Sequence, residues 1–308
     1  MPLPKVIAIV VTYNGSRWVQ NCFSSLTRSE YSVEVIVVDN NSTDDTATVI
    51  SSLFPAVTVI RNTTNAGFGG GNNQGIKIAL EKDADFVFLL NQDAWVEPDA
   101  IGNLVRSFRQ ASDFGIISPL HFNGDGSKLD NAFENYLGKE YVVDDIVREG
   151  SGQIIESEFI NAAAWMVSRD CLEKVGGFGY LFPQYGEDRD FIQRLHYYKM
   201  KLGVLSTARI FHDRPEKRFD FESADKIVWY YSIGAKVRLS DINNPWTSAY
   251  LSVLFWFFKD TVVFVFKGKI YAVQAFFNVI KEVFLASRND IIGYRKKISA
   301  GTRKLFIS

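Results

Sequence analysis

The stretch FVFLLNQDAWVE, residues 86–97, decides how the fold of the whole chain is interpreted. Five apolar residues stop abruptly at Asn91, Gln92 and Asp93, and an aromatic residue follows two positions later. A short apolar run of this kind is typical of a buried strand. This strand delivers a carboxylate and two amides to its end, where an ordinary turn would suffice. We therefore asked whether other strands deliver polar groups to the same place.

The first 120 residues alternate between short apolar runs and segments with a helical pattern. The runs cover residues 6–12, 33–39, 57–60 and 86–90, and the helical patterns cover residues 16–26, 44–53, 72–82 and 98–110. Such alternation is typical of a mostly parallel sheet that helices cover on both faces. We therefore predict an α/β fold with a mostly parallel central sheet.

The pattern loosens beyond residue 119. Residues 120–157 contain scattered Gly, Asp and Asn and predict a loop-rich excursion, after which structure returns at residues 159–167. A helix is predicted over residues 188–200 and a short strand over residues 202–206. No repeat of solenoid period is present.

The C-terminal region, residues 223–308, has a different character and predicts a helical appendage. Its segments 250–266 and 271–285 are strongly apolar and aromatic, and Lys259 and Asp260 interrupt the first. In the second, one helical face carries Phe276, Ile280, Val283 and Phe284. We expect amphipathic helices that lie in a membrane interface. The alternatives are helices that cover the core, an oligomer interface, and a true membrane span.

Composition and charge favour a globular protein at a membrane surface. Of the 308 residues, 47% are hydrophobic and 22% are charged, which is typical of a folded domain. The net charge of −1 gives no sign of a nucleic-acid partner. Residues 251–308 hold ten Lys or Arg and three Asp or Glu, a net +7, so the rest sums to −8. A basic, aromatic tail fits an anionic surface such as the inner leaflet of a membrane.

Cysteine usage and the N-terminus favour the cytoplasm. Cys22 and Cys171 are far apart and lack any CxxC context, which fits a reducing compartment. The N-terminal apolar run is short and leads into polar turn residues, so we interpret it as a first strand and not as a signal peptide.

Polar residues follow each of the four predicted strands. In open α/β sheets, ligands bind where the carboxyl ends of the strands meet, so these residues together predict a binding site. The residues in question are Thr12, Tyr13 and Asn14; Asp39 and Asn41; Asn65, Gly67, Gly69 and Gly71; and Asn91, Gln92 and Asp93.

The glycine-rich stretch, NAGFGGGNNQG, does not match the usual nucleotide motifs. Its spacing is not GxGxxG, it follows the third strand and not the first, and no GxxxxGK[ST] occurs. Glycines let a backbone approach phosphate oxygens closely, so we expect a loop that contacts a nucleotide in another manner.

Two carboxylates of this edge suit particular contacts. Asp39 can accept hydrogen bonds from a nucleobase or from ribose hydroxyls. Asp93 is a hard oxygen ligand for Mg²⁺ or Mn²⁺, and since it has only amides beside it, a substrate diphosphate must complete the coordination.

Further candidates lie downstream. Asp188 is in GEDRD at the start of a predicted helix, where acidic residues favour the helix dipole but where a carboxylate could also act as a general base. Of the three histidines, His212 alone is predicted to lie in a loop between polar neighbours, whereas His196 is part of a helix face and His121 begins the excursion.

Taken in order, these motifs resemble the inverting family-2 glycosyltransferases of the GT-A fold, and bacterial rhamnosyltransferases most of all. The resemblance spans residues 5–213 and rests on VVTYNG, VVDNNSTDDT, NAGFGGGNNQGI, LLNQDA, GGFGYLFPQYGEDRDFIQRL and the late His212. It implies a GT-A catalytic domain over residues 1–222, with a nucleotide-binding half (1–119) and an acceptor-binding half (120–222), followed by the helical region 223–308.

The resemblance also implies roles for individual residues. Asp188 matches the catalytic base, Asp93 the last position of the D-x-D metal motif, and His212 a metal or diphosphate contact. Asn91 stands at the first D-x-D position and adds no charge to the metal site. The implied nucleotide contacts are Thr12, Tyr13, Asn14, Asp39, Asn41, Asn65, Gly67, Gly69, Gly71, Asn91 and Gln92.

The implied activity is transfer of a sugar, with rhamnose favoured, from a dTDP- or UDP-linked donor to a hydroxyl of a saccharide or lipid-linked acceptor, with Mg²⁺ or Mn²⁺ as cofactor. The expected location is the cytoplasmic face of the membrane, in bacterial surface polysaccharide synthesis, and a homo-oligomer is compatible with the sequence. The alternatives are a catalytically degenerate nucleotide-sugar-binding protein and a sugar nucleotidyltransferase. The latter should carry basic residues in a glycine-rich loop after the first strand, where only Arg17 is basic.

Overall fold

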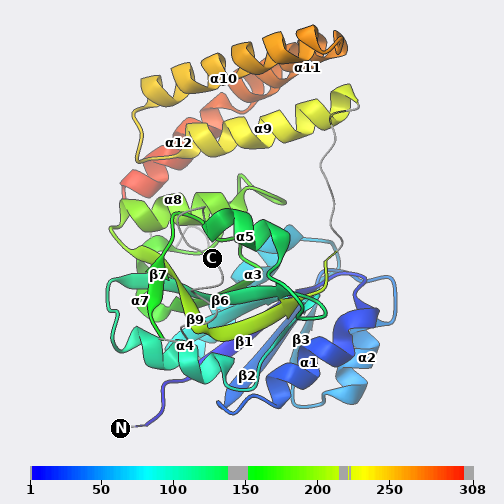
Figure 1. The fold of residues 1–308 in the computed structure, drawn as a ribbon, viewed down its shortest axis with the longest axis vertical. Helices are drawn as coiled ribbons and strands as arrows, with labels where there is room; N and C mark the ends of the chain where they lie inside the picture. The colour runs from blue at the N-terminus through cyan, green and yellow to red at the C-terminus, as the bar shows by residue number, and fades with distance from the viewer. Residues whose placement is uncertain (1, 138–151, 215–220, 222, 302–308) are drawn as a thin grey trace.

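The sheet is built outward from β1, the continuous apolar run near the N-terminus. The computed structural model describes residues 2–137, 152–214, 221 and 223–301, and Figure 1 shows an α/β body with a helical layer above it. Its strands are β1 (Val6–Thr12), β2 (Val33–Asp39), β3 (Thr58–Arg61), β4 (Phe86–Asn91), β5 (Ala94–Val96), β6 (Phe114–Asn123), β7 (Ile154–Glu156), β8 (Ala164–Ser168) and β9 (Lys201–His212).

The helices alternate with these strands in the first half of the chain and accumulate at its end. They are η1 (Ser16–Trp18), α1 (Val19–Thr27), α2 (Thr46–Leu53), α3 (Gly67–Glu81), α4 (Ala100–Phe108), α5 (Asn131–Leu137), α7 (Arg169–Val175), α8 (Glu187–Tyr197), α9 (Ala224–Ser240), α10 (Trp246–Phe266), α11 (Tyr271–Ile280), the π-helical η2 (Lys281–Ala286) and α12 (Arg288–Ser299).

The strand order is β3-β2-β1-β4-β8-β6-β9-β5, with β7 added on β9. The predicted parallel arrangement holds from β3 to β4, where β1 lies between β2 and β4. Beyond β4 the sheet is mixed, because β8 runs antiparallel to both β4 and β6 whereas β6 and β9 are parallel. The α/β fold is therefore confirmed, with a sheet that is parallel from β3 to β4 and mixed as a whole.

Alternation along β1 shows how helices cover both faces. Ile7 and Ile9 point into a core shared with α3, α7 and α8, whereas Val6, Ala8 and Val10 point into a core shared with α1, α2 and α4. Both faces of the strand are apolar for this reason, and the continuous apolar pattern of its sequence follows from it.

The bounds of the early elements agree closely with the sequence pattern, and those of the later ones do not. The strand predicted over residues 202–206 is longer, because β9 continues to His212. His212 therefore ends a strand instead of lying in a loop. The excursion contains the end of β6 and α5, and its residues 138–151 lie outside the described part of the chain.

The glycine-rich segment was predicted wrongly as a loop, since α3 already begins at Gly67. A Cβ atom on Gly71 would lie 2.8 Å from a methyl carbon of Val11, and one on Gly75 would lie 2.6 Å from a methyl carbon of Ile9. These glycines let α3 lie directly on β1. Gly69 is buried in the same way against Phe178.

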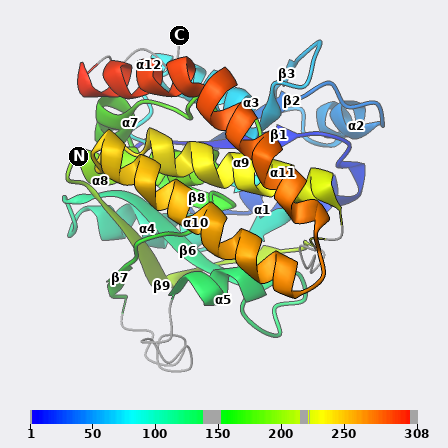
Figure 2. The ribbon, with the colours of Figure 1, turned by 90° about the horizontal axis from the view of Figure 1, so that it is seen from above.

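Helices α9 to α12 form a layer above α8 (Figures 1 and 2). Their shared core includes Phe276, Val283 and Phe284. The sequence predicted that this face of residues 271–285 would meet a membrane, but it packs against the other helices of the layer. Large exposed apolar side chains of this layer include Leu251, Phe255, Phe258 and Phe266 of α10, Ile270 between the helices, and Phe277 of α11. Among the described residues, α10 is the one helix long and apolar enough to cross a membrane by length and composition.

A buried polar group joins this layer to α8. Tyr294 of α12 donates a hydrogen bond to Asp190 Oδ2 at 2.6 Å, and the Arg194 guanidinium binds the same carboxylate, with its Nε at 3.0 Å. Arg194 also donates to the carbonyls of Val175 and Gly177. The three side chains are almost completely buried. Helix α8 therefore packs on the sheet through its apolar residues and is joined to α12 through Asp190.

Candidate functional site

The carboxyl ends of β1, β2 and β4 lie side by side, as the sequence predicts. Thr12 is in register with Asp39, and Val11 is in register with Asn91. Thr12 Oγ1 donates to Asp39 Oδ1 at 2.9 Å, and the backbone N–H and hydroxyl of Ser42 donate to the same carboxylate at 3.0 and 2.5 Å. Asp39 therefore shapes the turn after β2, and any ligand must use its remaining acceptor capacity.

Gln92, which directly follows β4, forms two hydrogen bonds with the loop after β1. Its Oε1 accepts from the Tyr13 backbone N–H at 3.0 Å, and its Nε2 donates to the Tyr13 carbonyl at 3.1 Å. Asn14, at φ 48°, accepts at Oδ1 from the backbone N–H of Thr43 at 2.8 Å. The Tyr13 ring is left 46% exposed at this edge, where a planar ligand can pack on it.

The segment after the third strand contributes fewer exposed groups to the candidate site than the sequence predicts. Asn65 accepts at Oδ1 from the Gly67 backbone N–H at 2.8 Å, so its side chain stabilises the turn that precedes α3. Asn40, which the sequence analysis did not single out, donates to the Gly67 carbonyl and accepts from Asn62. Asn41 is exposed, with φ 65°. Gly67 and the two asparagines Asn41 and Asn65 thus lie near the surface, whereas Gly69 and Gly71 are covered by protein.

Asp93 and His212, which are 119 positions apart in the sequence, meet where β5 pairs with β9. Asp93 Oδ1 lies 3.3 Å from His212 Nε2, which is the distance of an ion pair but without the angles of a hydrogen bond. On the other side, His212 Nδ1 lies 3.7 Å from Asp130 Oδ2. Arg214 binds Asp130 through both Nε (2.9 Å) and Nη2 (2.6 Å).

The Asp130–Arg214 pair was missed in the sequence, because its members lie 84 positions apart. Burial raises the pKa of the Asp130 carboxyl, but the Arg214 guanidinium and the Phe133 backbone N–H lower it more, so it stays ionised. An ionised carboxylate facing Nδ1 orients a histidine that offers Nε2 to a ligand.

The residues present are compatible with a divalent cation held together with a substrate. Both ring nitrogens of the buried His212 lack a hydrogen-bond partner within the described ranges, and Asp93 is 20% exposed beside it. In the described part of the chain, no group of three or more His, Cys, Asp or Glu forms a complete metal cage. Asp93 and His212 can thus supply two ligands, and phosphate oxygens and water must supply the rest.

Asp188 lies in the first turn of α8, at the wall of a cavity of about 770 Å³. Its Oδ1 accepts from the Arg189 backbone N–H at 2.7 Å. Burial raises the pKa of Asp188, which makes its carboxylate a better proton acceptor than an exposed aspartate. From α8 the cavity is also lined by Ile192 and His196, which follow Asp188 at helical spacing.

Two further groups next to Asp188 were not predicted. Glu187 is buried with one carboxylate oxygen unpartnered in the described structure, and burial together with the charge of Asp188 raises its pKa to about 8. Tyr136 of α5 lines the same cavity. Burial raises its pKa, and the charges of Asp188 and Asp130 raise it further, whereas the charge of Arg214 lowers it. Tyr136 therefore lines the Asp188 cavity and is close enough to the Asp130–Arg214 pair for their charges to act on its hydroxyl.

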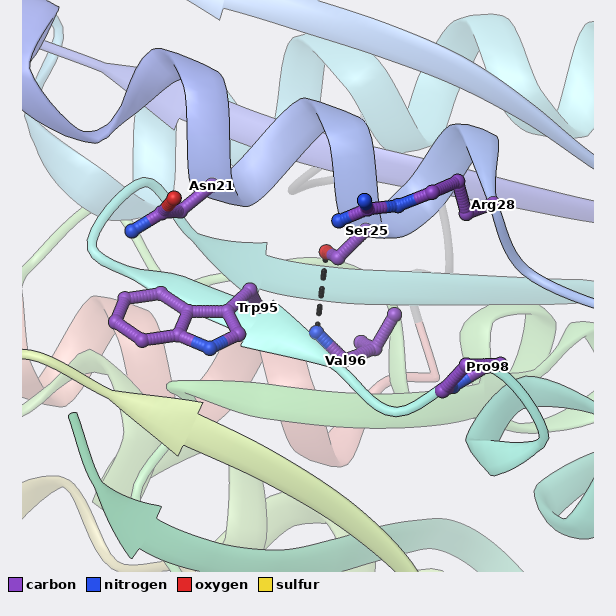
Figure 3. A pocket seen from close by; sticks show the side chains of 6 residues that line it. All are labelled: Asn21, Ser25, Arg28, Trp95, Val96 and Pro98. Atoms are coloured by element: carbon purple, nitrogen blue, oxygen red, sulfur yellow. Dashed lines mark hydrogen bonds between the residues drawn. The ribbon is translucent and has the colours of Figure 1, made fainter. Parts of the chain in front are cut away.

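A second hollow of about 420 Å³ lies between α1 and β5 (Figure 3). Val96 donates its backbone N–H to Ser25 there, and Arg28 is its one ionisable lining residue. It contains none of the predicted site residues and no acid or base that could act on a sugar hydroxyl, so we do not regard it as the reaction site.

Comparison with known proteins agrees with this architecture. Residues 7–174 match the profile of Glycosyl transferase family 2, so the chain belongs to that family. The O-antigen chain rhamnosyltransferase WbaN of Salmonella anatum is 24% identical over 254 residues, which cover 79% of this chain and 74% of WbaN.

Solved structures resemble the whole chain. Residues 1–349 of S. aureus TarS in complex with UDP-GlcNAc align with a TM-score of 0.59 at 17% identity, covering 97% of this chain and 92% of that one. The mannosyltransferase PcManGT from Pyrobaculum calidifontis, in complex with GDP-Man and Mn²⁺, aligns with a TM-score of 0.58 at 15% identity, covering 100% and 86%. These likenesses establish the GT-A fold, and the family match establishes a glycosyltransferase.

Proposed function

We propose that this glycosyltransferase moves a hexosyl group, rhamnose in the first instance, from a nucleoside-diphosphate donor to a hydroxyl of a saccharide acceptor, with inversion at the anomeric carbon. The observation that carries the proposal is the position of Asp188, a carboxylate with a raised pKa at the wall of a large cavity. Rhamnose is favoured because WbaN is a rhamnosyltransferase and the similarity covers most of both chains.

In the proposed reaction, Asp188 accepts the proton of the acceptor hydroxyl as that oxygen attacks the anomeric carbon. Attack comes from the face opposite the nucleotide, so the new bond forms as the bond to the diphosphate breaks. The buried, largely protonated Glu187 adds no second charge next to Asp188 below about pH 8. Glu187 is therefore the neutral member of this pair at neutral pH, and Asp188 is the member proposed to accept the proton.

The donor nucleotide is proposed to lie along the carboxyl edge of β1, β2 and β4. Tyr13 offers an exposed side chain to the base, and Thr12 and Asp39 are hydrogen-bonded to each other at the same edge of the sheet. The backbone at Gly67 lies at the start of α3, where phosphate oxygens are favoured. Asn14, Asn41, Asn65, Asn91 and Gln92 shape the rim, and Asn14, Asn65 and Gln92 do so through the hydrogen bonds described above.

A divalent cation, Mn²⁺ or Mg²⁺, is proposed to bind Asp93 and His212 together with the diphosphate. When bound, such an ion stabilises negative charge on the leaving diphosphate. Asn91 contributes no charge there, but the Asp130 carboxylate lies behind His212, and Asp213, whose backbone N–H donates to the Asp93 carbonyl, adds a second negative group to this region. The Mn²⁺ in the PcManGT complex is a precedent within the same fold.

The C-terminal region is proposed to rest on an anionic membrane surface, at the cytoplasmic face, where a lipid-linked acceptor of surface polysaccharide synthesis would be found. The outer side of α10 and α11 exposes large apolar side chains, and the region 251–308 carries a net +7. Apolar area and positive charge together are what interfacial binding requires.

A donor panel tests the proposal. Thermal unfolding of the full chain is measured with dTDP-rhamnose, UDP-glucose and UDP-galactofuranose, each with and without Mn²⁺. We expect one donor to stabilise the protein in a Mn²⁺-dependent manner, and Asp93→Ala to remove the Mn²⁺ dependence. Equal shifts with and without Mn²⁺ would contradict the metal site, and no shift with any nucleotide sugar would contradict the donor site.

A further inference from the structure

The cavity beside Asp188 is closed by two parts of the chain that the sequence assigns to different regions. Tyr136, Asp188 and Arg189 line it from the α/β body. Trp229 and Arg238 of α9, together with Trp256 of α10, line it from the C-terminal layer. The C-terminal helices therefore shape the space next to the proposed base, in addition to carrying the exposed apolar surface.

Two arginines converge on this cavity without a carboxylate partner. The Arg189 guanidinium stacks on Phe159 at 4.0 Å, and that of Arg238 stacks on Trp256 at 3.9 Å. In the described ranges, no carboxylate lies within ion-pair distance of either guanidinium. Arg238 donates one N–H to the Gly234 carbonyl, and the other donors of both groups stay available.

The two positive charges are close enough to influence each other. Burial lowers the pKa of Arg238, and the charge of Arg189 lowers it further. Stacking on Phe159 and on Trp256 places both guanidinium groups at the wall of one cavity, whose own carboxylates, Asp188 and Glu158, form no ion pair with them. A ligand with several anionic oxygens would relieve this repulsion.

Aromatic side chains form the adjoining wall. Tyr185 packs edge-on against Trp229, with ring centroids 5.1 Å apart, and both rings are partly exposed. Tyr185 has φ 65°, a left-handed conformation that bulky residues rarely adopt, and it directly precedes Gly186 at φ 93° and then α8. Such strain is concentrated at functional sites, where it fixes a side chain in place. The wall suits the apolar faces of a sugar ring.

We propose that this cavity binds an acceptor whose sugar is joined to phosphate or diphosphate, with Arg189 and Arg238 binding the phosphate oxygens and Trp229 and Tyr185 packing against the sugar. The inference rests on the proposed function and adds the chemical class of its acceptor. Guanidinium groups bind phosphate through paired N–H donors. On α10, Phe255 is 69% exposed and is next in sequence to the cavity residue Trp256, so an exposed apolar side chain that a lipid could contact lies within one helical turn of the cavity wall.

Binding of phosphate probes to the full chain tests the inference. Titration calorimetry is carried out with the donor site saturated by the nucleoside diphosphate and Mn²⁺ chosen from the donor panel. The probes are farnesyl diphosphate and glucose 1-phosphate, with farnesol, methyl glucoside and glucuronate as counterparts without phosphate. We expect one or both phosphates to bind, and Arg189→Gln and Arg238→Gln each to weaken that binding about ten- to a hundredfold, as loss of hydrogen bonds to a charged group implies.

Controls separate this inference from general effects. Arg238→Lys keeps the charge but loses the paired donors and should recover only part of the affinity, and Arg28→Gln, in the hollow of Figure 3, should bind as the wild type does. Thermal unfolding verifies that each variant is folded. If only farnesyl diphosphate binds, the acceptor is lipid-linked, and if only glucose 1-phosphate binds, the acceptor is soluble.

Four results would overturn the inference: no binding of either phosphate, equal binding of farnesol or methyl glucoside, tighter binding of glucuronate than of both phosphates, and affinities unchanged in both arginine variants. Its failure is distinct from failure of the proposed function, because donor turnover by the wild-type chain is measured independently of these probes.

Discussion

The hydroxyl of Tyr294 tests how the C-terminal helices are attached to the helix that carries Asp188. Tyr294→Phe removes a single oxygen that donates to Asp190 Oδ2 at 2.6 Å, in a site where both side chains are buried. Asp190 keeps the hydrogen bond from Arg194 Nε at 3.0 Å, so no buried charge is left without a partner. A hydrogen bond to a charged group contributes about 1.5–3 kcal/mol, and we expect the free energy of unfolding to fall by about that amount.

Urea unfolding followed by circular dichroism measures this change. Because a chain of this size need not unfold in one step, hydrogen exchange of the amides in α8 and α12 is measured in parallel. Tyr197→Phe is the matched control, since Tyr197 is an exposed tyrosine on α8, and its effect should stay within about 0.5 kcal/mol. An effect of Tyr294→Phe no larger than that of the control would refute the attachment.

Three further predictions follow from the same geometry. Glu187→Gln should stabilise the protein by an amount that grows as pH rises from 4.5 to about 8, because the buried acid keeps a proton that the unfolded chain loses; equal differences in unfolding temperature at pH 5 and pH 8 would contradict this. As pH is lowered, kcat should fall with a midpoint above the pKa of about 4 of an ordinary aspartate, because burial raises the pKa of Asp188 and only its ionised form accepts a proton; a kcat that stays constant down to pH 4 would argue against Asp188 as the base. Phe255→Gln and Phe258→Gln together should reduce flotation with anionic vesicles, whereas Leu53→Gln, at an exposed position on α2, should not; equal flotation of both variants would remove α10 from the membrane proposal.

The parallel half of the sheet and the grouping of Thr12, Asp39 and Asn91 could be predicted from the sequence. Strands buried on both faces are continuous apolar runs, and parallel strands bring their carboxyl ends to one edge. The observed register of Thr12 with Asp39 is a direct consequence. The approach of His212 to Asp93 was indicated only through the resemblance to a known family, because no local pattern joins β5 to β9.

Three features could not be predicted, and each depends on tertiary contacts. Glycine is a poor helix former, so a helix beginning at Gly67 forms because its glycines fit against Val11 and Ile9. The apolar face of residues 271–285 has the same pattern whether it meets lipid or another helix. The walls of the Asp188 cavity contributed by α9 and α10 depend on how the C-terminal layer docks on α8. The Tyr294–Asp190 contact, between residues 104 positions apart in the sequence, contributes to that docking.

The claim that Asp188 is the base of a sugar transfer is tested most directly by comparing the wild type with Asp188→Asn on the donor that the panel selects. Nucleoside diphosphate release and the anomeric configuration of the product are measured together with the affinity for the donor. We predict a product of inverted configuration and a loss of about 10²–10⁴-fold in kcat for Asp188→Asn, the usual contribution of general base catalysis, with donor affinity nearly unchanged. A retained configuration, or a loss of donor affinity that matches the loss of rate, would contradict the role assigned to Asp188.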